Sequence, residues 1–143
     1  MTNIQDVMTQ QVETCSPSSS IIDVAKLMKD LDVGAIPVSE NNELKGILTD
    51  RDIVIHGLAE KGSADFQVKE IMTENVDYVK PDTDINEAYT TMAEKQIRRL
   101  PVLDQNNQVV GIVSLGDLAV KLNQDRNSGD TLEDISRPIG PDQ

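Results

Sequence analysis

Gly46-Ile-Leu-Thr-Asp-Arg-Asp52 and Gly111-Ile-Val-Ser-Leu-Gly-Asp117 share the pattern Gly-Ile-x-Thr/Ser-x-x-Asp, and a shift of 65 residues superimposes them. Further upstream, a shift of 64 residues pairs Met8-Thr9 with Met72-Thr73. The extra residue falls in the polar segment around Asn106-Asn107, and turns tolerate insertions. The chain is therefore expected to contain two copies of one structural unit.

The first copy predicts the order helix, strand, turn, strand, helix. Its first helix is expected to begin with the capping-box-like Ser20-Ile-Ile-Asp23, which precedes apolar residues at helical spacing. Because proline cannot donate a ladder hydrogen bond, Pro37 is expected at the start of its strand or at a sheet edge. The predicted strands are 35–38 and 44–48 in the first copy and 100–103 and 109–113 in the second, each pair followed by a helix starting at Thr49 or Ser114.

A sheet of two or three strands with two helices is too thin to bury both of its faces. Two copies packed sheet to sheet solve this problem. The expected fold class is α+β (α/β-like): two tandem repeats whose short sheets pack across a pseudo-twofold axis, with flanking helices. The predicted boundaries are 1–60 for the first repeat, 61–70 for a linker, 71–123 for the second repeat and 124–143 for a C-terminal tail.

Composition excludes several functions. The 143 residues include 25 acidic and 13 basic ones, a formal net charge of −12 that repels nucleic acid, and only three aromatic side chains are available for base stacking. No apolar run is long enough for a membrane helix, and the N-terminus lacks the features of a secretory signal. Because Cys15 is the only cysteine, a cytoplasmic location is expected.

Taken together, the motifs resemble those of CBS domains, which are named after cystathionine β-synthase. Met-Thr, a proline, an amphipathic helix, Pro-Val and the Gly-Ile motif follow one another in both halves, over about residues 5–123. Tandem pairs of these repeats form Bateman modules, as in IMP dehydrogenase and the γ subunit of AMP-activated protein kinase. The chain is similar to a small stand-alone bacterial-type CBS pair, and Ile97–Asp117 resembles a nucleotide-binding repeat of that γ subunit.

The resemblance implies a ligand pocket at each Gly-Ile motif, in the cleft between the repeats, with Thr49 and Asp52 in one pocket and Ser114 and Asp117 in the other. A carboxylate can accept from both hydroxyls of a ribose, and a hydroxyl at a helix N-terminus suits phosphate or ribose oxygens. The same Thr/Ser-x-x-Asp spacing is also a capping box, in which these side chains serve only their own helix. Both interpretations remain open at this stage.

Arg98 and Arg99 precede the first strand of the second repeat, where the first repeat has Gly34-Ala35. Arginine binds phosphate bidentately, and strand alternation lets only one of the two point into a pocket. The resemblance favours Arg99 for phosphate. A solvated charge or a salt bridge is the alternative. The first repeat offers only Arg51, whose charge Asp50 offsets, so the second pocket is expected to be better equipped for phosphate.

The base of a nucleotide needs an apolar slot, for which the candidate walls and rim residues are Ile36, Pro37, Leu100, Pro101, Thr14 and Tyr78. Apolar strand residues usually only pack, so a purely structural role is the alternative for these positions. Met28 and Met92 are expected in the helix core.

No catalytic constellation or metal-ligand spacing accompanies the single histidine, His56, which is expected at the surface or in an interface. The predicted function is therefore that of a non-catalytic regulatory module that senses AMP, ADP, ATP or a related adenosyl ligand and has no obligatory cofactor. The alternative is an interaction or dimerisation module with empty pockets. The expected partners are the ligand, a second copy of the chain in a homodimer, and an effector protein that the sequence does not identify. The helix faces around Val24–Leu31 and Tyr89–Lys95 are the candidate dimer contacts.

Overall fold

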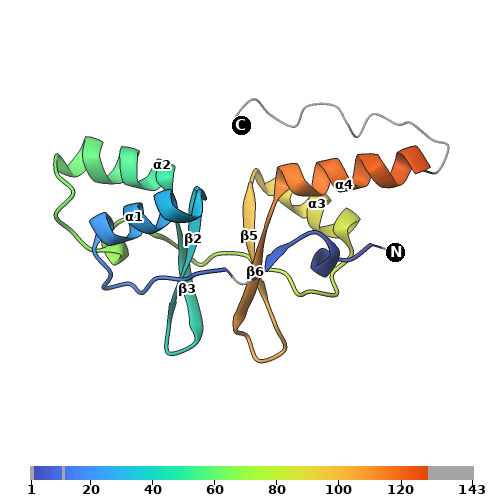
Figure 1. Cartoon of the computed structure of the whole chain (residues 1–143), viewed down its shortest axis with the longest axis horizontal. Helices are drawn as coiled ribbons and strands as arrows, with labels where there is room; N and C mark the ends of the chain where they lie inside the picture. The colour runs from blue at the N-terminus through green and yellow to red at the C-terminus, as the bar shows by residue number, and fades with distance from the viewer. Residues whose placement is uncertain (1, 11, 129–143) are drawn as a thin grey trace. The chain divides into compact units, whose positions relative to one another are not determined.

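The computed structural model describes residues 2–10 and 12–128 and divides them into two compact units (Figure 1). We name each unit after the glycine of its Gly-Ile motif. The Gly46 unit contains residues 12–77 and 105–109, and the Gly111 unit contains residues 2–10, 78–104 and 110–128. Each combines a three-stranded sheet with helices, which confirms the predicted α+β class. The part of the predicted tail beyond residue 128 lies outside the described residues.

The Gly46 unit follows the predicted order and adds a third strand. Its hairpin turns at Asn41 and Asn42, whose φ angles of 55° and 65° match the left-handed conformation that a two-residue hairpin loop requires. The sheet order is β2-β3-β4. Its elements are α1 (Ile21–Leu31), β2 (Ala35–Glu40), β3 (Glu43–Thr49), α2 (Asp50–Asp52), the π-helical continuation η2 (Ile53–Ala59), the 3₁₀ turn η3 (Val68–Glu70) and β4 (Thr73–Glu74).

The Gly111 unit repeats this arrangement with the sheet order β1-β6-β5. Its first helix is capped by Asp84, which accepts from the backbone N–H of Asn86 at 2.7 Å, whereas Ser20 of the other unit accepts from Asp23 at 3.1 Å. Both helices end at a residue in the left-handed conformation. The elements are the 3₁₀ turn η1 (Ile4–Asp6), β1 (Thr9–Gln10), α3 (Ile85–Lys95), β5 (Arg99–Leu103), β6 (Val109–Ser114) and α4 (Leu115–Ser128).

The short strands β1 and β4 lie in unexpected places. By sequence, Met8-Thr9 opens the first repeat, yet Thr9 pairs with Ile112 in the Gly111 unit. Met72-Thr73 opens the second repeat, yet Thr73 pairs with Ile47 in the Gly46 unit. Each compact unit is therefore completed by the leading segment of the other sequence repeat.

Pro37 and Pro101 lie where their missing N–H costs no ladder bond. β2 is an edge strand of its antiparallel ladder, and the carbonyl of Pro37 accepts from the N–H of Cys15 at 3.1 Å, on the side away from β3. The nitrogen of Pro37 faces the same side, because N and C=O of one residue in such a ladder point the same way. Pro101 likewise accepts from Val79 at 3.1 Å. The predicted edge position is confirmed.

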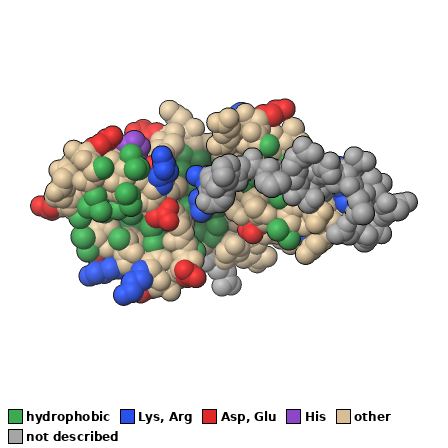
Figure 2. Space-filling view, turned by 90° about the horizontal axis from the view of Figure 1, so that it is seen from above, with side chains coloured by type: hydrophobic (Ala, Val, Ile, Leu, Met, Phe, Trp, Pro, Cys, Tyr) green, Lys and Arg blue, Asp and Glu red, His purple; other side chains and the backbone are tan. Residues whose placement is uncertain are grey.

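Each unit has its own apolar core. Met28 and Met92, the predicted helix-core residues, are buried. The leading segments contribute as well, with Ile4 and Val68 fully buried. Exposed hydrophobic side chains, in contrast, gather over the helices of the Gly46 unit, on the left of Figure 2. No helix among residues 2–10 and 12–128 has both the length and the apolar character needed to cross a bilayer.

Gly46 and Gly111 allow the leading strands to approach. A Cβ atom at Gly111 would lie 2.8 Å from the carbonyl oxygen of Thr9 and 2.8 Å from Sδ of Met8, and a Cβ at Gly46 would collide with the carbonyl oxygen of Thr73. These neighbours include backbone, which cannot move aside without breaking the β1–β6 or β3–β4 pairing. The glycine of the Gly-Ile motif is therefore required for the third strand of each sheet.

We expect Gly46→Ala and Gly111→Ala each to lower the free energy of unfolding by about 1–3 kcal/mol, because the added methyl group overpacks the strand contact. Gly116→Ala is the matched control, since its Cβ would meet nothing closer than Ser114 Oγ at 3.9 Å. Gly116 lies in α4, where alanine is expected to stabilise by roughly 0.5–1 kcal/mol. Denaturant titrations measure all three. Equal effects of the three substitutions would contradict the steric explanation.

Candidate functional site

In each unit, backbone hydrogen bonds join the start of the second helix to the start of the first strand. In the Gly46 unit, Thr49 pairs with Ala35 in the sheet, and the N–H of Asp50 donates to the carbonyl of Gly34 at 2.9 Å. In the Gly111 unit, the N–H of Leu115 donates to the carbonyl of Arg98 at 2.8 Å. The hydroxyl residue that begins the second helix therefore lies beside the start of the first strand in both units.

Thr49 and Asp52 form a complete capping box. The Thr49 hydroxyl accepts from the N–H of Asp52 at 3.1 Å, and the Asp52 carboxylate accepts from the N–H of Thr49 at 3.0 Å. Both side chains are half-buried. Each group thus satisfies an otherwise unpaired donor of its own helix, the structural role that the sequence left open.

Ser114 and Asp117 share the spacing but form only half of this arrangement. The Ser114 hydroxyl accepts from the N–H of Asp117 at 3.0 Å. The Asp117 carboxylate is exposed, and within residues 2–10 and 12–128 it has neither a hydrogen bond nor an ion pair. It is therefore available to a ligand in a way that the Asp52 carboxylate is not.

The arginines also differ between the units. Arg99, the first residue of β5, is half-buried, and its guanidinium has no hydrogen bond or ion pair in the described part of the chain. It precedes Leu100, which packs into the core, so strand alternation puts Arg99 on the opposite face of the sheet. Arg98 is exposed and engaged in a contact of its own. Arg51 of the Gly46 unit is exposed.

The residues predicted to form an apolar slot fall into three groups. Ile36 and Leu100 are each 1% exposed and belong to the core of their own unit, which accounts for their apolar character without a ligand. Pro37 and Pro101 are also buried, on the opposite strand face, while Thr14 is exposed. Tyr78 is exposed and lies under Lys80, whose Nζ is 5.6 Å from the ring centroid. Their contact with a base remains a prediction.

The reactive side chains do not converge. His56 is exposed, as predicted, with Nδ1 at 3.4 Å from Oε2 of Glu60. Burial raises the pKa of the Cys15 thiol to about 11, so it is protonated and unreactive near neutral pH. Within residues 2–10 and 12–128, no three His, Cys, Asp or Glu side chains are grouped so as to hold a metal ion.

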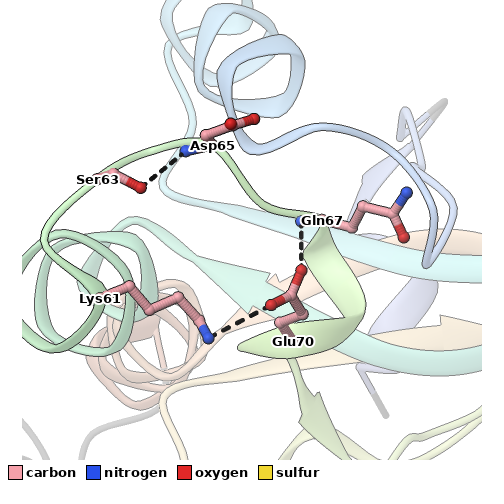
Figure 3. Close-up of polar contacts among 5 residues, drawn as sticks. All are labelled: Lys61, Ser63, Asp65, Gln67 and Glu70. Atoms are coloured by element: carbon pink, nitrogen blue, oxygen red, sulfur yellow. Dashed lines mark hydrogen bonds and ion pairs between the residues drawn. The ribbon is translucent and has the colours of Figure 1, made fainter.

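The polar segment 61–70, predicted as a linker, is bonded to the Gly46 unit. Glu70 accepts from the N–H of Gln67 at 3.0 Å and pairs with Lys61 at 3.4 Å, while Asp65 donates its N–H to the hydroxyl of Ser63 (Figure 3). The sequence contains a sign of this packing. The shift of 64 residues pairs Val68 of the segment with Ile4, another apolar residue shortly before a Met-Thr pair, so the repeat begins within the segment. Open hollows of about 460 and 830 Å³ flank the segment, lined partly by these charged groups.

Each α+β unit carries one Gly-Ile motif at the junction of its central strand and second helix, so the chain is a tandem repeat of one structural unit. The family profile described as CBS domain matches residues 4–58 and 68–123. The chain belongs to the CBS domain family.

Relatives support this assignment. "CBS domain-containing protein YhcV" of Bacillus subtilis is 46% identical over 136 residues, which cover 95% of this chain and 96% of that protein. The CBS domain pair of protein MJ0100, solved with 5′-methylthioadenosine and S-adenosyl-L-methionine, matches with a TM-score of 0.79 and 27% identity over 87% of this chain and 98% of that one. CBSX2 of Arabidopsis thaliana, solved with AMP, matches with a TM-score of 0.73 and 26% identity over 88% and 99%.

The two aspartates are expected to differ in their effect on stability. Asp52→Ala removes the acceptor for the Thr49 N–H and should lower the free energy of unfolding by about 1 kcal/mol. Asp117→Ala removes no described side-chain hydrogen bond. Both substitutions lose the interaction of the carboxylate with the helix dipole, so Asp117→Ala should lower the free energy of unfolding by less than Asp52→Ala. Urea titrations of the two variants measure the difference. A larger loss for Asp117→Ala would contradict the one-sided cap.

Glu70 predicts a pH dependence of stability. The hydrogen bond from Gln67, followed by the contacts with Lys61, lowers the pKa of Glu70 below its ordinary value of 4.5. Its stabilising effect is therefore present above 4.5 and lost as the pH falls through the lowered value. Glu70→Gln should flatten the decline of stability over this acidic range. Glu74→Gln, at an exposed carboxylate of the neighbouring strand β4, is the control and should leave the decline unchanged.

Proposed function

We propose that this chain is a non-catalytic regulatory module that binds an adenosine nucleotide or related adenosyl ligand through the Gly111 unit, with Ser114, Asp117 and Arg99 as its main polar contacts. The observation that carries the proposal is the Asp117 carboxylate, which bonds to nothing in the described part of the chain, whereas its counterpart Asp52 accepts the hydrogen bond of its capping box. An adenosyl group supplies the donors that this carboxylate lacks, because a ribose presents two adjacent hydroxyls.

The neighbours support the class of ligand. AMP is bound by CBSX2, and 5′-methylthioadenosine and S-adenosyl-L-methionine by protein MJ0100. These ligands share adenine and ribose and differ at the 5′ position. The ribose is therefore the common element that an aspartate such as Asp117 can recognise, while the 5′ substituent discriminates among ligands.

Arg99 favours a 5′-phosphate among these alternatives. Arg99 begins β5, directly after Arg98, whose carbonyl accepts from the N–H of Leu115 at 2.8 Å, and the Arg99 guanidinium has no partner among the described residues. A planar guanidinium binds phosphate oxygens bidentately, and it supplies local positive charge in a chain of net charge −12. The matching position of the Gly46 unit is Ala35, which offers neither. We therefore expect the Gly111 unit to supply the main contacts for one phosphate-bearing ligand.

Calorimetric titration of AMP and adenosine tests the roles of Asp117 and Arg99 separately. Asp117→Asn should weaken both ligands by tenfold or more, because each carries the ribose and a charge-assisted hydrogen bond contributes about 1.5–3 kcal/mol. Arg99→Gln should weaken AMP by a similar factor and adenosine much less. Arg51→Gln removes an exposed arginine of the Gly46 unit and is the control.

Three outcomes oppose the proposal. Equal losses of AMP and adenosine in Arg99→Gln would mean that Arg99 shapes the site instead of holding phosphate. A loss in Arg51→Gln as large as in Arg99→Gln would move the phosphate contact to the Gly46 unit. No heat with either ligand in the wild-type protein, confirmed by the absence of a thermal shift, would favour the alternative of an interaction module with empty pockets.

A further inference from the structure

The second helix of the Gly46 unit changes its form along its length. Residues 50–52 are α-helical, η2 is π-helical, and beyond it the N–H of Gly62 donates to the carbonyl of Leu58 at 3.0 Å, which is α-helical spacing. In a π-helix each N–H bonds five residues back instead of four, so the turn is wider. Such segments are rare and are frequently found at functional sites. The matching helix of the Gly111 unit, α4, is α-helical over all 14 residues.

A phenylalanine side chain lies against the wide turn. A Cβ atom at Gly57 would lie 2.7 Å from Cζ of Phe66 and 3.5 and 3.6 Å from the two ring carbons beside Cζ, so the tip of the ring points at the helix backbone. Gly57 is buried and Phe66 is half-buried. The ring fits there only because position 57 has no side chain. A side chain inserted against the backbone is a known cause of helix irregularity.

The Gly111 unit fills the corresponding space in the opposite way. The repeat shifts place Leu122 opposite Gly57 and Thr2 opposite Phe66. Leu122 is 5% exposed in the core of its unit, and the hydroxyl of Thr2 donates to Oδ2 of Asp125 on the same helix at 2.9 Å. In this unit the helix supplies the large side chain and the leading segment supplies the small one. In the Gly46 unit the sizes are exchanged, and that unit has the π-helical segment.

The ring is part of a segment with contacts of its own. The carbonyl of Phe66 accepts from the N–H of Ile21 at 3.1 Å, at the start of α1. Nζ of Lys61 lies 5.4 Å from the centroid of the ring, and Lys61 pairs with Glu70 at 3.4 Å (Figure 3). Any displacement of the segment 61–70 therefore moves the ring with respect to Gly57.

The other end of η2 reaches the Gly-Ile motif. The segment follows directly after Asp52, whose carboxylate closes the capping box with Thr49. When a helical segment changes from π to α spacing, each N–H moves its bond by one residue, so the residues at one end turn relative to those at the other. Gly57 and the capping box lie on one continuous helix. The helical form of η2 thus links the position of the ring to the motif.

We propose that Phe66 and Gly57 form a conformational switch in the Gly46 unit, in which η2 is π-helical while the ring is inserted and becomes α-helical when the segment 61–70 withdraws it. The capping box at the start of the helix responds to the withdrawal. Phe66 lies between the two ranges that match the family profile, so the switch uses the connection between the repeats. It does not depend on a ligand at the Gly111 unit.

Exchanging the two residues for their counterparts tests the size match. Gly57→Leu should lower the urea midpoint because its side chain meets the ring, and Phe66→Thr should lower it because a cavity is left. The double variant should lose less than the two single losses combined, and less than Gly57→Leu alone. If Gly57→Leu does not fold, Gly57→Ala, whose Cβ meets the same ring atom, replaces it in the comparison. Additive losses would overturn the size match.

Nuclear magnetic resonance measures the helical form directly. In the wild-type protein, contacts from the α proton of residue i to the amide proton of residue i+5 should run through η2. In Phe66→Thr and in the double variant, contacts from i to i+4 should replace them. The amide signals of Thr49 and Asp52 should move in the same variants, because both N–H groups are bonded in the capping box. A π pattern that persists in both variants, or unchanged signals from the capping box, would overturn the proposal.

The control is Lys61→Met, which removes the charge over the ring and leaves the ring in place. It should keep the π pattern and the wild-type amide signals. Loss of the π pattern in Lys61→Met as complete as in Phe66→Thr would mean that the charge, and not the ring, holds the helix, and would overturn the proposal.

Relaxation dispersion tests whether the switch moves in the wild-type protein. The amides of η2 should exchange between two forms on the microsecond-to-millisecond timescale, and this exchange should be absent from the double variant, which has no ring to insert. A wild-type helix without such exchange would overturn the switch.

Discussion

The close approach of a leading strand to a glycine supports the rest of each unit. β4 can pair with β3 only because Gly46 has no side chain, and β1 can pair with β6 only because Gly111 has none. The pairing makes β3 and β6 the central strands of their sheets. These central strands end at Thr49 and Ser114, the hydroxyl residues of the candidate sites. The position of each hydroxyl, and of the aspartate three residues later, therefore depends on the contact between the leading strand and the motif glycine, which has no side chain.

Most helices and strands could be predicted from side-chain patterns. The features that could not be predicted, the pairings of β1 and β4, depend on backbone hydrogen bonds. The repeat shifts, the apolar spacing after Ser20 and the turn at Asn41 and Asn42 indicated the helices and hairpins that the structure contains. The strands β1 and β4 are two residues long and exposed, so no alternation marks them. Nor can two similar repeats indicate which sheet each leading segment joins, because Ile4 and Val68 have equivalent roles in the cores of the two units.

The candidate site shows a different limit of the sequence. Thr49 and Asp52 have the same spacing as Ser114 and Asp117, and both pairs were predicted as ligand residues or caps. The structure distinguishes the two pairs by the hydrogen bonding of the aspartate. The Asp52 carboxylate accepts from the N–H of Thr49, whereas for Asp117 the structure describes no such bond to Ser114. Side-chain orientation at a half-buried or exposed position depends on differences of about 1 kcal/mol, which residue identity and spacing do not resolve.

The two copies have therefore kept one backbone and diverged in what their surfaces offer. The Gly46 unit has a closed capping box, Ala35 at its first strand and an apolar helical face. The Gly111 unit has an exposed carboxylate at Asp117, Arg99 at its first strand, and helices on which Val120 is the one large exposed hydrophobic residue among the described ones. This divergence is the reason we propose the Gly111 unit, and not the Gly46 unit, for the main ligand contacts. The chain crosses between the units shortly after β1 and β4, the strands seated on the two glycines.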